Sequence, residues 1–326
     1  MFRVVLLSCL CVLCLCGAGF AAGGDFMPEN GDGEHWAEFR VSSLRCVIGD
    51  NAPAGDLHRA GYNGIFQMAA PGFEGPVFVP SYAGLNLEHY FDGRPWNEAR
   101  EIFFEPRVAP MSFRRVDDAT AELHQPLTPY WGVESWSRFT LREPDRVDFV
   151  FRCTPHKPLE GGFLGCFWAS YMAMPEDKSL YFIRAGATLD APKWAQFCTL
   201  AHNRDSTILP ESDDGAEIEF PESGTNLYNS ISPLRHGPPL FYGRIRDHVL
   251  ICLFEPGKHI RFSHSPSGGG GTPGGVDTNP AWDFQFIVPG AVPGGEYGFQ
   301  ARVIFKPWKG RGDVIDEARL FFDGLK

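Results

Sequence analysis

The chain has 326 residues and a formal net charge of −11. An acidic protein repels nucleic acid and anionic lipid, so neither is an expected partner. Its length is sufficient for a sizeable core, and its 37 glycines and 27 prolines divide it into short segments typical of an all-β protein.

The first 22 residues have the three-part layout of a secretory signal peptide. Arg3 is their only charged residue, an apolar run extends from there to Cys16, and small residues lead to an expected cleavage site at Ala22 or one residue earlier. The apolar run is shorter than the roughly 20 residues that a membrane-spanning helix needs. We therefore expect residues 1–22 to be removed and residues 23–326 to form one extracytoplasmic domain, secreted or periplasmic, without a lipid anchor or membrane segment.

Five cysteines remain after this cleavage: Cys46, Cys153, Cys166, Cys198 and Cys252. An odd number leaves at least one thiol free, and no pair has the C-x-x-C spacing of a zinc site. We expect most of them to be small buried side chains in strands. One disulfide can form in an oxidising compartment, and the sequence does not choose its pair.

Alternating apolar and polar residues predict many strands. The alternation is strict in 146–153, 281–288 and 297–305, where every second side chain is apolar. Further strands are predicted at 35–44, 64–67, 101–106, 111–116, 121–125, 180–184, 194–200, 240–246 and 249–255. Helices are predicted only at 95–100 and 313–322. Without an internal repeat, this pattern indicates a large antiparallel β-sandwich with long loops and few short helices.

The segment 84–93 (GLNLEHYFDG) contains the first candidate site residues. Glu88 and His89 are adjacent, so a regular strand would point them to opposite faces, and only a bulge would bring both to one cleft. His89 is either a half-buried histidine bonded to backbone, or an acid or base that faces a sugar.

The segment 128–140 (TPYWGVESWSRFT) contains the second group. Glu134, Trp136 and Arg138 share one face of an extended strand, and Trp131 precedes them. Indole faces beside carboxylate and guanidinium groups suit a sugar, which has apolar faces and hydroxyl edges. The alternative is a solvated sheet face with a Glu–Arg pair.

Four later residues complete the candidates. Tyr171 can donate to a sugar oxygen, and Arg235 can meet a uronate carboxylate. His202 follows a predicted strand, at a place where sandwich proteins build sites. His264 precedes the glycine-rich segment 265–275, which we interpret as a surface loop because no lysine or helix follows it, as a phosphate-binding loop would require.

These segments resemble those of the galactose-mutarotase-like super-sandwich proteins, which include aldose epimerases and the sandwich domains of polysaccharide lyases. The segment 84–93 is similar to the His-x-Tyr-Phe-Asn segment of aldose epimerases, although Tyr90 follows His89 directly and an aspartate replaces the asparagine. The strands at 131–140 and 282–286 add to the resemblance. It implies a super-sandwich fold that binds carbohydrate on a concave sheet face.

We therefore predict a carbohydrate-active protein. A histidine, His89 or His202, would exchange a proton with a carboxylate, Glu134 or Glu88, in an epimerase, lyase or hydrolase reaction. Substrate contacts are expected from Glu88, Trp131, Trp136, Arg138, Tyr171, Arg235 and His264. No cofactor or metal is expected, since a metal would require folding to gather Glu88, His89, His202 and His264. The alternative is a non-catalytic glycan-binding or cell-envelope interaction module.

Overall fold

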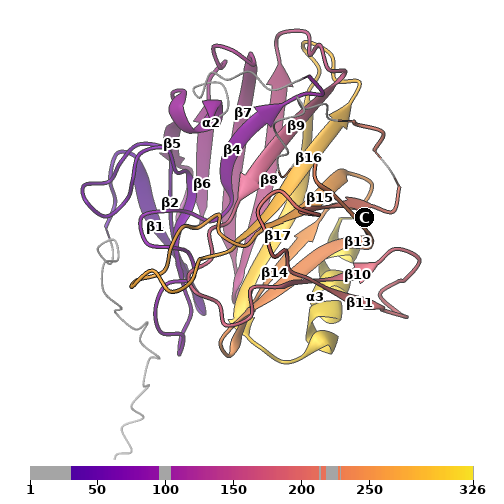
Figure 1. Cartoon of the computed structure of the whole chain (residues 1–326). Coiled ribbons are helices and arrows are strands. Elements are labelled where there is room, and N and C mark those ends of the chain that lie inside the picture. The colour runs from indigo at the N-terminus through magenta and orange to yellow at the C-terminus, as the bar shows by residue number, and fades with distance from the viewer. Residues whose placement is uncertain (1–30, 95–103, 213, 218–226, 228, 326) are drawn as a thin grey trace, which may run out of the picture.

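The computed structural model describes residues 31–94, 104–212, 214–217, 227 and 229–325 (Figure 1). Strands make up 48% of it and helices 7%, so the predicted all-β sandwich is confirmed. The expected signal peptide at 1–22 and the helix predicted at 95–100 lie outside the described residues.

A long sheet dominates the fold. Its strands are β4 (Asn86–Phe91), β5 (Ser112–Arg115), β6 (Thr120–Gln125), β7 (Val133–Arg142), β8 (Arg146–Pro155), β9 (Phe163–Ala169), β10 (Leu180–Arg184), β11 (Trp194–Phe197), β12 (Thr207–Pro210), β13 (Ile231–Ile245), β14 (His248–Phe254), β15 (His259–Ser265), β16 (Ala281–Pro289) and β17 (Tyr297–Pro307). Their order is β4-β9-β16-β15-β12-β13-β14-β17-β8-β7-β6-β5, and β10 and β11 are attached at β13. Among the strand pairs of the described residues, β12–β13 is parallel and the rest are antiparallel.

The two halves of the long sheet face each other across the main core. Phe151 of β8 packs edge-on against Trp168 of β9, with ring centroids 4.7 Å apart. Phe299 of β17 contacts the same indole at 5.4 Å, and Phe284 of β16 stacks on it at 5.0 Å. The strict alternation predicted for 146–153, 281–288 and 297–305 is confirmed, because the apolar positions of these strands are buried in this core.

A smaller sheet of β1 (Trp36–Val41), β2 (Leu44–Gly49) and β3 (Gly64–Ala69) packs beside the long sheet. Cys46 and Ile48 of β2 enter the main core, whereas Val47 belongs to a second apolar cluster on the other face. The single strand predicted at 35–44 is wrong in extent, because a turn at 42–43 separates β1 from β2.

Two helices are described. Helix α3 (Arg311–Gly324) confirms the helix predicted at 313–322, and its buried Val314 and Ala318 belong to a third apolar cluster with Ile251 of β14. Helix α2 (Glu105–Val108) contradicts the strand predicted at 101–106 within the described residues. Pro106 at the start of α2 explains the difference, since its fixed φ suits the first turn of a helix.

All five cysteines of the expected mature chain are free in the structure. Cys46, Cys153, Cys166 and Cys252 are buried, which confirms that most of them act as small core side chains, and Cys198 is exposed.

Candidate functional site

One face of strands β4, β9, β16 and β15 points away from the main core, and we call it the site face. Trp168 of β9 and Phe284 of β16 point into the core, so their neighbours Phe167, Asp283 and Gln285 point to the site face. Asp283 and Gln285 are polar yet almost fully buried. Buried polar groups in the middle of a sheet mark this face as a candidate site.

A bulge in β4 brings two titratable residues to this face. Leu87 pairs with Trp168 and His89 with Phe167, so Glu88 is an extra residue in the ladder. An extra residue of this kind re-aims the side chains beside it. The Oε2 atom of Glu88 lies 3.5 Å from Nε2 of His89. The strand therefore has the bulge that both side chains need to reach one face.

Glu88 is the centre of a buried polar network. The Tyr171 hydroxyl donates to its Oε1 at 2.5 Å, and Nη1 of Arg107 donates to the same oxygen at 2.9 Å. Burial opposes ionisation, but His89, Arg107 and the Tyr171 hydroxyl outweigh it and lower the pKa of Glu88 to about 2. Glu88 is therefore a carboxylate at neutral pH.

Arg107 connects this network to a pair of aromatic rings. It comes from α2, donates from Nε to the carbonyl of Gly61 at 2.7 Å, and lies 4.1 Å from the ring centroid of Tyr62. Tyr62 stacks on Tyr82 at 4.6 Å, and the Arg59 guanidinium lies 4.9 Å from the Tyr82 ring. Two stacked phenol rings flanked by two cations thus lie next to Glu88.

The loop that carries Tyr62 is fastened to β4. Asn63 accepts from the backbone N–H of Leu87 at 3.0 Å and donates to the carbonyl of the same residue at 2.9 Å. Gly64 has φ +96, and a Cβ there would lie 2.7 Å from the carbonyl oxygen of Gly84. The local sequence Tyr-Asn-Gly therefore fixes where Tyr62 lies.

Asp283 and His202 are the other titratable groups of the site. Burial, and after it the charge of Glu88, raises the pKa of Asp283 well above its ordinary value, although the Ser170 N–H donates to its carboxyl at 3.1 Å. Burial therefore favours the protonated form of Asp283. Burial lowers the pKa of His202, against the attraction of Glu88, so this imidazole is neutral there. Its Nδ1 lies 2.8 Å from the hydroxyl oxygen of Ser265.

Strand pairing, and the charge of Glu88 that acts on His202, place this imidazole near the Glu88 network. Ser265, the partner of His202, lies opposite Ala281 in the β15–β16 ladder, and Ala281 forms an isolated bridge with Tyr171. Of the residues predicted from the sequence, the structure therefore gathers Glu88, His89, Tyr171 and His202.

Sequence reasoning missed several residues of this site: Arg59, Tyr62, Tyr82, Arg107 and Asp283. Asp283 had a readable signal, because it is an acid at the centre of the apolar strand 281–288. Tyr62 lies in a Tyr-Asn-Gly turn, which is a sign of fixed backbone. Nothing local marks Arg107, whose role depends on how α2 packs against β4.

Glu134 is not brought to His89 or His202. The adjacent Ser135 points into the main core, where it bonds with the Tyr90 hydroxyl at 2.9 Å, so Glu134 points outward from β7. Its carboxylate lies 2.8 Å from Nε2 of His124. This outer face is across the core from the site face.

The predicted row on β7 exists as this outer face. Trp136 is partly exposed and stacks on His124, with ring centroids 4.9 Å apart. Arg138 donates from Nε to Glu122 at 3.0 Å. The row thus contains both the exposed indole expected of a sugar-binding surface and the Glu–Arg pair of the alternative.

The remaining candidates lie apart from the Glu88 network. Trp131 is partly buried against the main core. Arg235 donates to carbonyls of its own strand. His264 is fully buried between the Thr199 hydroxyl and the carbonyl of Lys178, and burial lowers its pKa to about 4. This is the environment of a core histidine.

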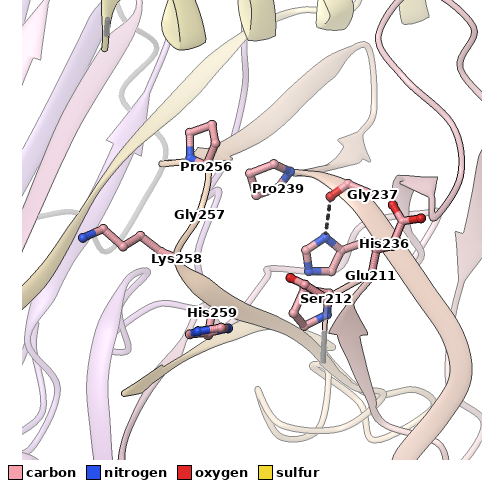
Figure 2. A pocket seen from close by; sticks show the side chains of 10 residues that line it. Glu211, Ser212, His236, Gly237, Pro239, Pro256, Gly257, Lys258 and His259 are labelled. Atoms are coloured by element: carbon pink, nitrogen blue, oxygen red, sulfur yellow. Dashed lines mark hydrogen bonds between the residues drawn. The ribbon is translucent and has the colours of Figure 1, made fainter. Parts of the chain in front are cut away.

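A separate cavity of about 310 Å³ opens between the end of β12, the middle of β13 and the start of β15 (Figure 2). Glu211, Lys258 and His259 line it together with His236, whose Nε2 lies 2.8 Å from the carbonyl oxygen of Ile260. Burial lowers the pKa of His236 to about 4. None of the candidates predicted from the sequence lines this cavity.

Two kinds of feature are absent from the described part of the chain. No group of three or more histidine, cysteine, aspartate or glutamate side chains is arranged to hold a metal ion. No helix there has the length and apolar character to cross a membrane.

The sequence matches no protein-family profile and no curated protein. The fold is similar to a candidate aldose 1-epimerase from Escherichia coli K12, with 11% identity and a TM-score of 0.46, over 84% of this chain and 99% of that one. An aldose epimerase homologue from C. elegans is 12% identical with a TM-score of 0.41, over 83% of this chain and 98% of the homologue. A heparan sulfate lyase from Pedobacter heparinus is 11% identical with a TM-score of 0.42, over 85% of this chain and 36% of the lyase.

These are the two groups that the sequence resemblance named, aldose epimerases and polysaccharide lyases. At such identities the likeness concerns the fold alone.

Proposed function

We propose that this protein is an exported carbohydrate-active enzyme that transfers protons to and from a sugar held on the site face. The proposal depends on one observation: two neighbouring carboxyl groups have pKa values driven in opposite directions. The pKa of Glu88 is lowered to about 2, whereas that of Asp283 is raised. Active sites use such pairs to keep one carboxyl group protonated and the other ionised at the same pH.

The roles follow from the protonation states. Burial favours the protonated form of Asp283, which acts as the general acid, and neutral His202 acts as the general base. Glu88 stays ionised and orients Tyr171 and Arg107, so it is a positioning residue. The proposed histidine–carboxylate pair is thus His202 with Asp283.

This arrangement favours an epimerase or a lyase over a retaining hydrolase. A retaining hydrolase needs an ionised carboxylate free to attack the sugar. Both oxygens of Glu88 are engaged, Oε1 by Tyr171 and Arg107 and Oε2 by His89. Epimerisation and β-elimination need only an acid and a base, which His202 and Asp283 supply.

Tyr82, which is partly exposed and stacks on the buried Tyr62, supplies an apolar surface for the sugar, and Arg59 supplies donors at its edge. Export belongs to the proposal as well, and the leader expected at residues 1–22 supports it.

The test uses the purified chain with free aldoses and with uronate-containing polysaccharides. Anomeric exchange is followed by polarimetry, and unsaturated uronate by its absorbance. Asp283→Asn and His202→Gln should each lower the rate by roughly 10²–10⁴-fold, the usual contribution of a general acid or base. Glu134→Gln, on the far side of the core, is the control and should keep full activity. Folded Asp283→Asn and His202→Gln variants with unchanged rates would refute the assignment.

The pH profile is a second test of the same roles. His202 must be neutral, so activity should fall as the pH drops through its pKa, which lies below 6.5. Asp283 must be protonated, so activity should fall again as the pH rises through its raised pKa. A profile with no acid limb would exclude His202 as the base.

A non-catalytic glycan-binding module is the second candidate, and one observation favours it. Trp136 is partly exposed on the outer face and is braced by His124, as a ring that stacks on a sugar would be. On this reading a glycan array should detect binding that Trp136→Ala removes, without turnover of any substrate. Unchanged binding would remove Trp136 from the site.

A further inference from the structure

A second cavity, of about 350 Å³, lies between the outer face of β7, β8 and β17 and the C-terminal half of α3. Arg138, Arg142 and Arg302 line it from the strands, together with Asp148, and Leu320 lines it from the helix. We call it the arginine groove. It is on the far side of the main core from Glu88, so it has no part in the proposed acid–base chemistry. Its volume falls within the roughly 300–1,000 Å³ of small-molecule sites.

Each of the three guanidinium groups is bound to a carboxylate along one of its edges. Arg142 donates from Nε to Asp148 at 3.2 Å, and Arg302 donates from Nε to the other oxygen of the same carboxylate at 2.6 Å. Arg138 donates through Nε and Nη2 to Glu122. Two acids thus anchor three arginines, and Asp148 is shared.

The anchored guanidinium groups still have N–H donors that these two carboxylates do not occupy. Within the described part of the chain, the Nη atoms of Arg142 and Arg302 and the Nη1 atom of Arg138 make no hydrogen bond that would occupy them. A guanidinium fixed along one edge offers its other N–H groups in a set geometry, which matches the two oxygens of a carboxylate or sulfate. Anchoring also reduces the side-chain entropy that binding would otherwise cost.

The groove also has an apolar wall. Leu320 is 61% exposed, and Leu325 and Phe321 lie beside it. Arg302 lies 5.3 Å from the ring centroid of Phe321. A ligand that fits this surface has an anionic group for the arginines and an apolar face for the helix. An acidic sugar has both, through its carboxylate or sulfate and the C–H face of its ring.

We propose that the arginine groove is a second binding site, specific for carboxylated or sulfated sugar residues. It recognises charge without transforming the sugar, and it operates whether or not the site face is catalytic. The protein as a whole has a formal charge of −11, so attraction of an anion here is local and should weaken as salt rises.

The experiment is titration calorimetry of the purified chain with three short oligosaccharides. One is a heparin fragment, which carries sulfates and carboxylates; one is an oligogalacturonate, which carries carboxylates alone; the third is neutral cellotetraose. The proposal predicts binding of at least one acidic probe and none of the neutral one. Comparing the two acidic probes identifies the anion that the groove prefers.

Variants place the binding in the groove. Arg142→Gln and Arg302→Gln should each weaken binding by about tenfold, the value of a lost hydrogen bond to a charged group. The side chain of Arg142 is 60% exposed, so replacing it should leave the fold intact. This variant therefore tests the proposal even if the Arg302 variant does not fold. Arg319→Gln is the matched control, because this arginine lies on α3 but pairs with Asp190, and it should keep the native affinity. Equal binding of the neutral probe, no binding of either acidic probe, or full affinity in folded Arg142→Gln would overturn the proposal.

Discussion

Replacing Glu88 with glutamine should lower the free energy of unfolding at neutral pH. The difference from the native protein should shrink in acid, because there the native protein loses the same contribution. Glutamine keeps the size of the side chain and an oxygen for Tyr171 and Arg107, but it leaves the Arg107 guanidinium without its counter-charge. A group whose pKa is lowered on folding stabilises the folded state above its unfolded pKa and loses that contribution as pH falls toward its folded pKa. For Glu88 the ordinary value is 4.5 and the folded value is about 2.

That difference corresponds to about 3 kcal/mol. We therefore expect Glu88→Gln to lower the free energy of unfolding by about 3 kcal/mol at pH 7, with the deficit shrinking below pH 4.5 and nearly absent at pH 2. Urea unfolding followed by tryptophan fluorescence at pH 7, 5, 4 and 3 measures it, with linear extrapolation at each pH.

Glu134→Gln provides the control. Glu134 is partly exposed and pairs with His124 on the outer face, so its variant should lose less than about 1 kcal/mol at every pH. The reasoning fails if the deficit of Glu88→Gln is the same at pH 3 as at pH 7, because the cost would then come from packing and not from charge.

Three further predictions concern the framework. Gly64→Ala should lower the free energy of unfolding by about 2 kcal/mol or more, measured by urea unfolding, because φ is +96 and a Cβ would lie 2.7 Å from a carbonyl oxygen; an unchanged midpoint would contradict this. Arg261→Leu should cost about 3–5 kcal/mol by leaving the buried Asp214 carboxylate unpaired, and Asp214→Leu added to it should restore part of the loss. If refolding with oxidised glutathione forms a disulfide, peptide mass spectrometry should find it between Cys153 and Cys166, because these two buried thiols lie within hydrogen-bond reach of each other in the core; another pair would contradict this assignment.

Strands with a strict period of two could be predicted because one side of each must be apolar to face the core. Strands β8 and β17 are examples. The turn at 42–43 could not be predicted, because its local sequence has no glycine or proline. The backbone N–H of Ser42 is bonded to the carboxylate of Glu143, 101 positions away. A contact so distant in sequence leaves no local signal.

The candidate site was partly predictable for the same reason. Glu88, His89 and Tyr171 are polar groups among apolar neighbours, which the sequence displays. The sequence marks Asp283 as an acid within an apolar strand, but it does not show that Asp283 shares a face with Glu88 while Glu134 does not, because this depends on which side of the main core each strand presents. That is set by how the long sheet folds over, and by a bulge that the strand pattern alone does not require.

The strands at the two ends of the main strand order, β4 and β5, are edges at which a strand from another molecule could pair. Strand β5 is only four residues long and includes Arg114 and Arg115. In β4 the side-chain amide of Asn63 occupies the peptide groups of Leu87, where an incoming strand would bind. Short, charged or already occupied margins prevent edge-to-edge aggregation. The same amide that anchors the Tyr62 loop therefore also protects the protein from assembling into fibrils through this margin.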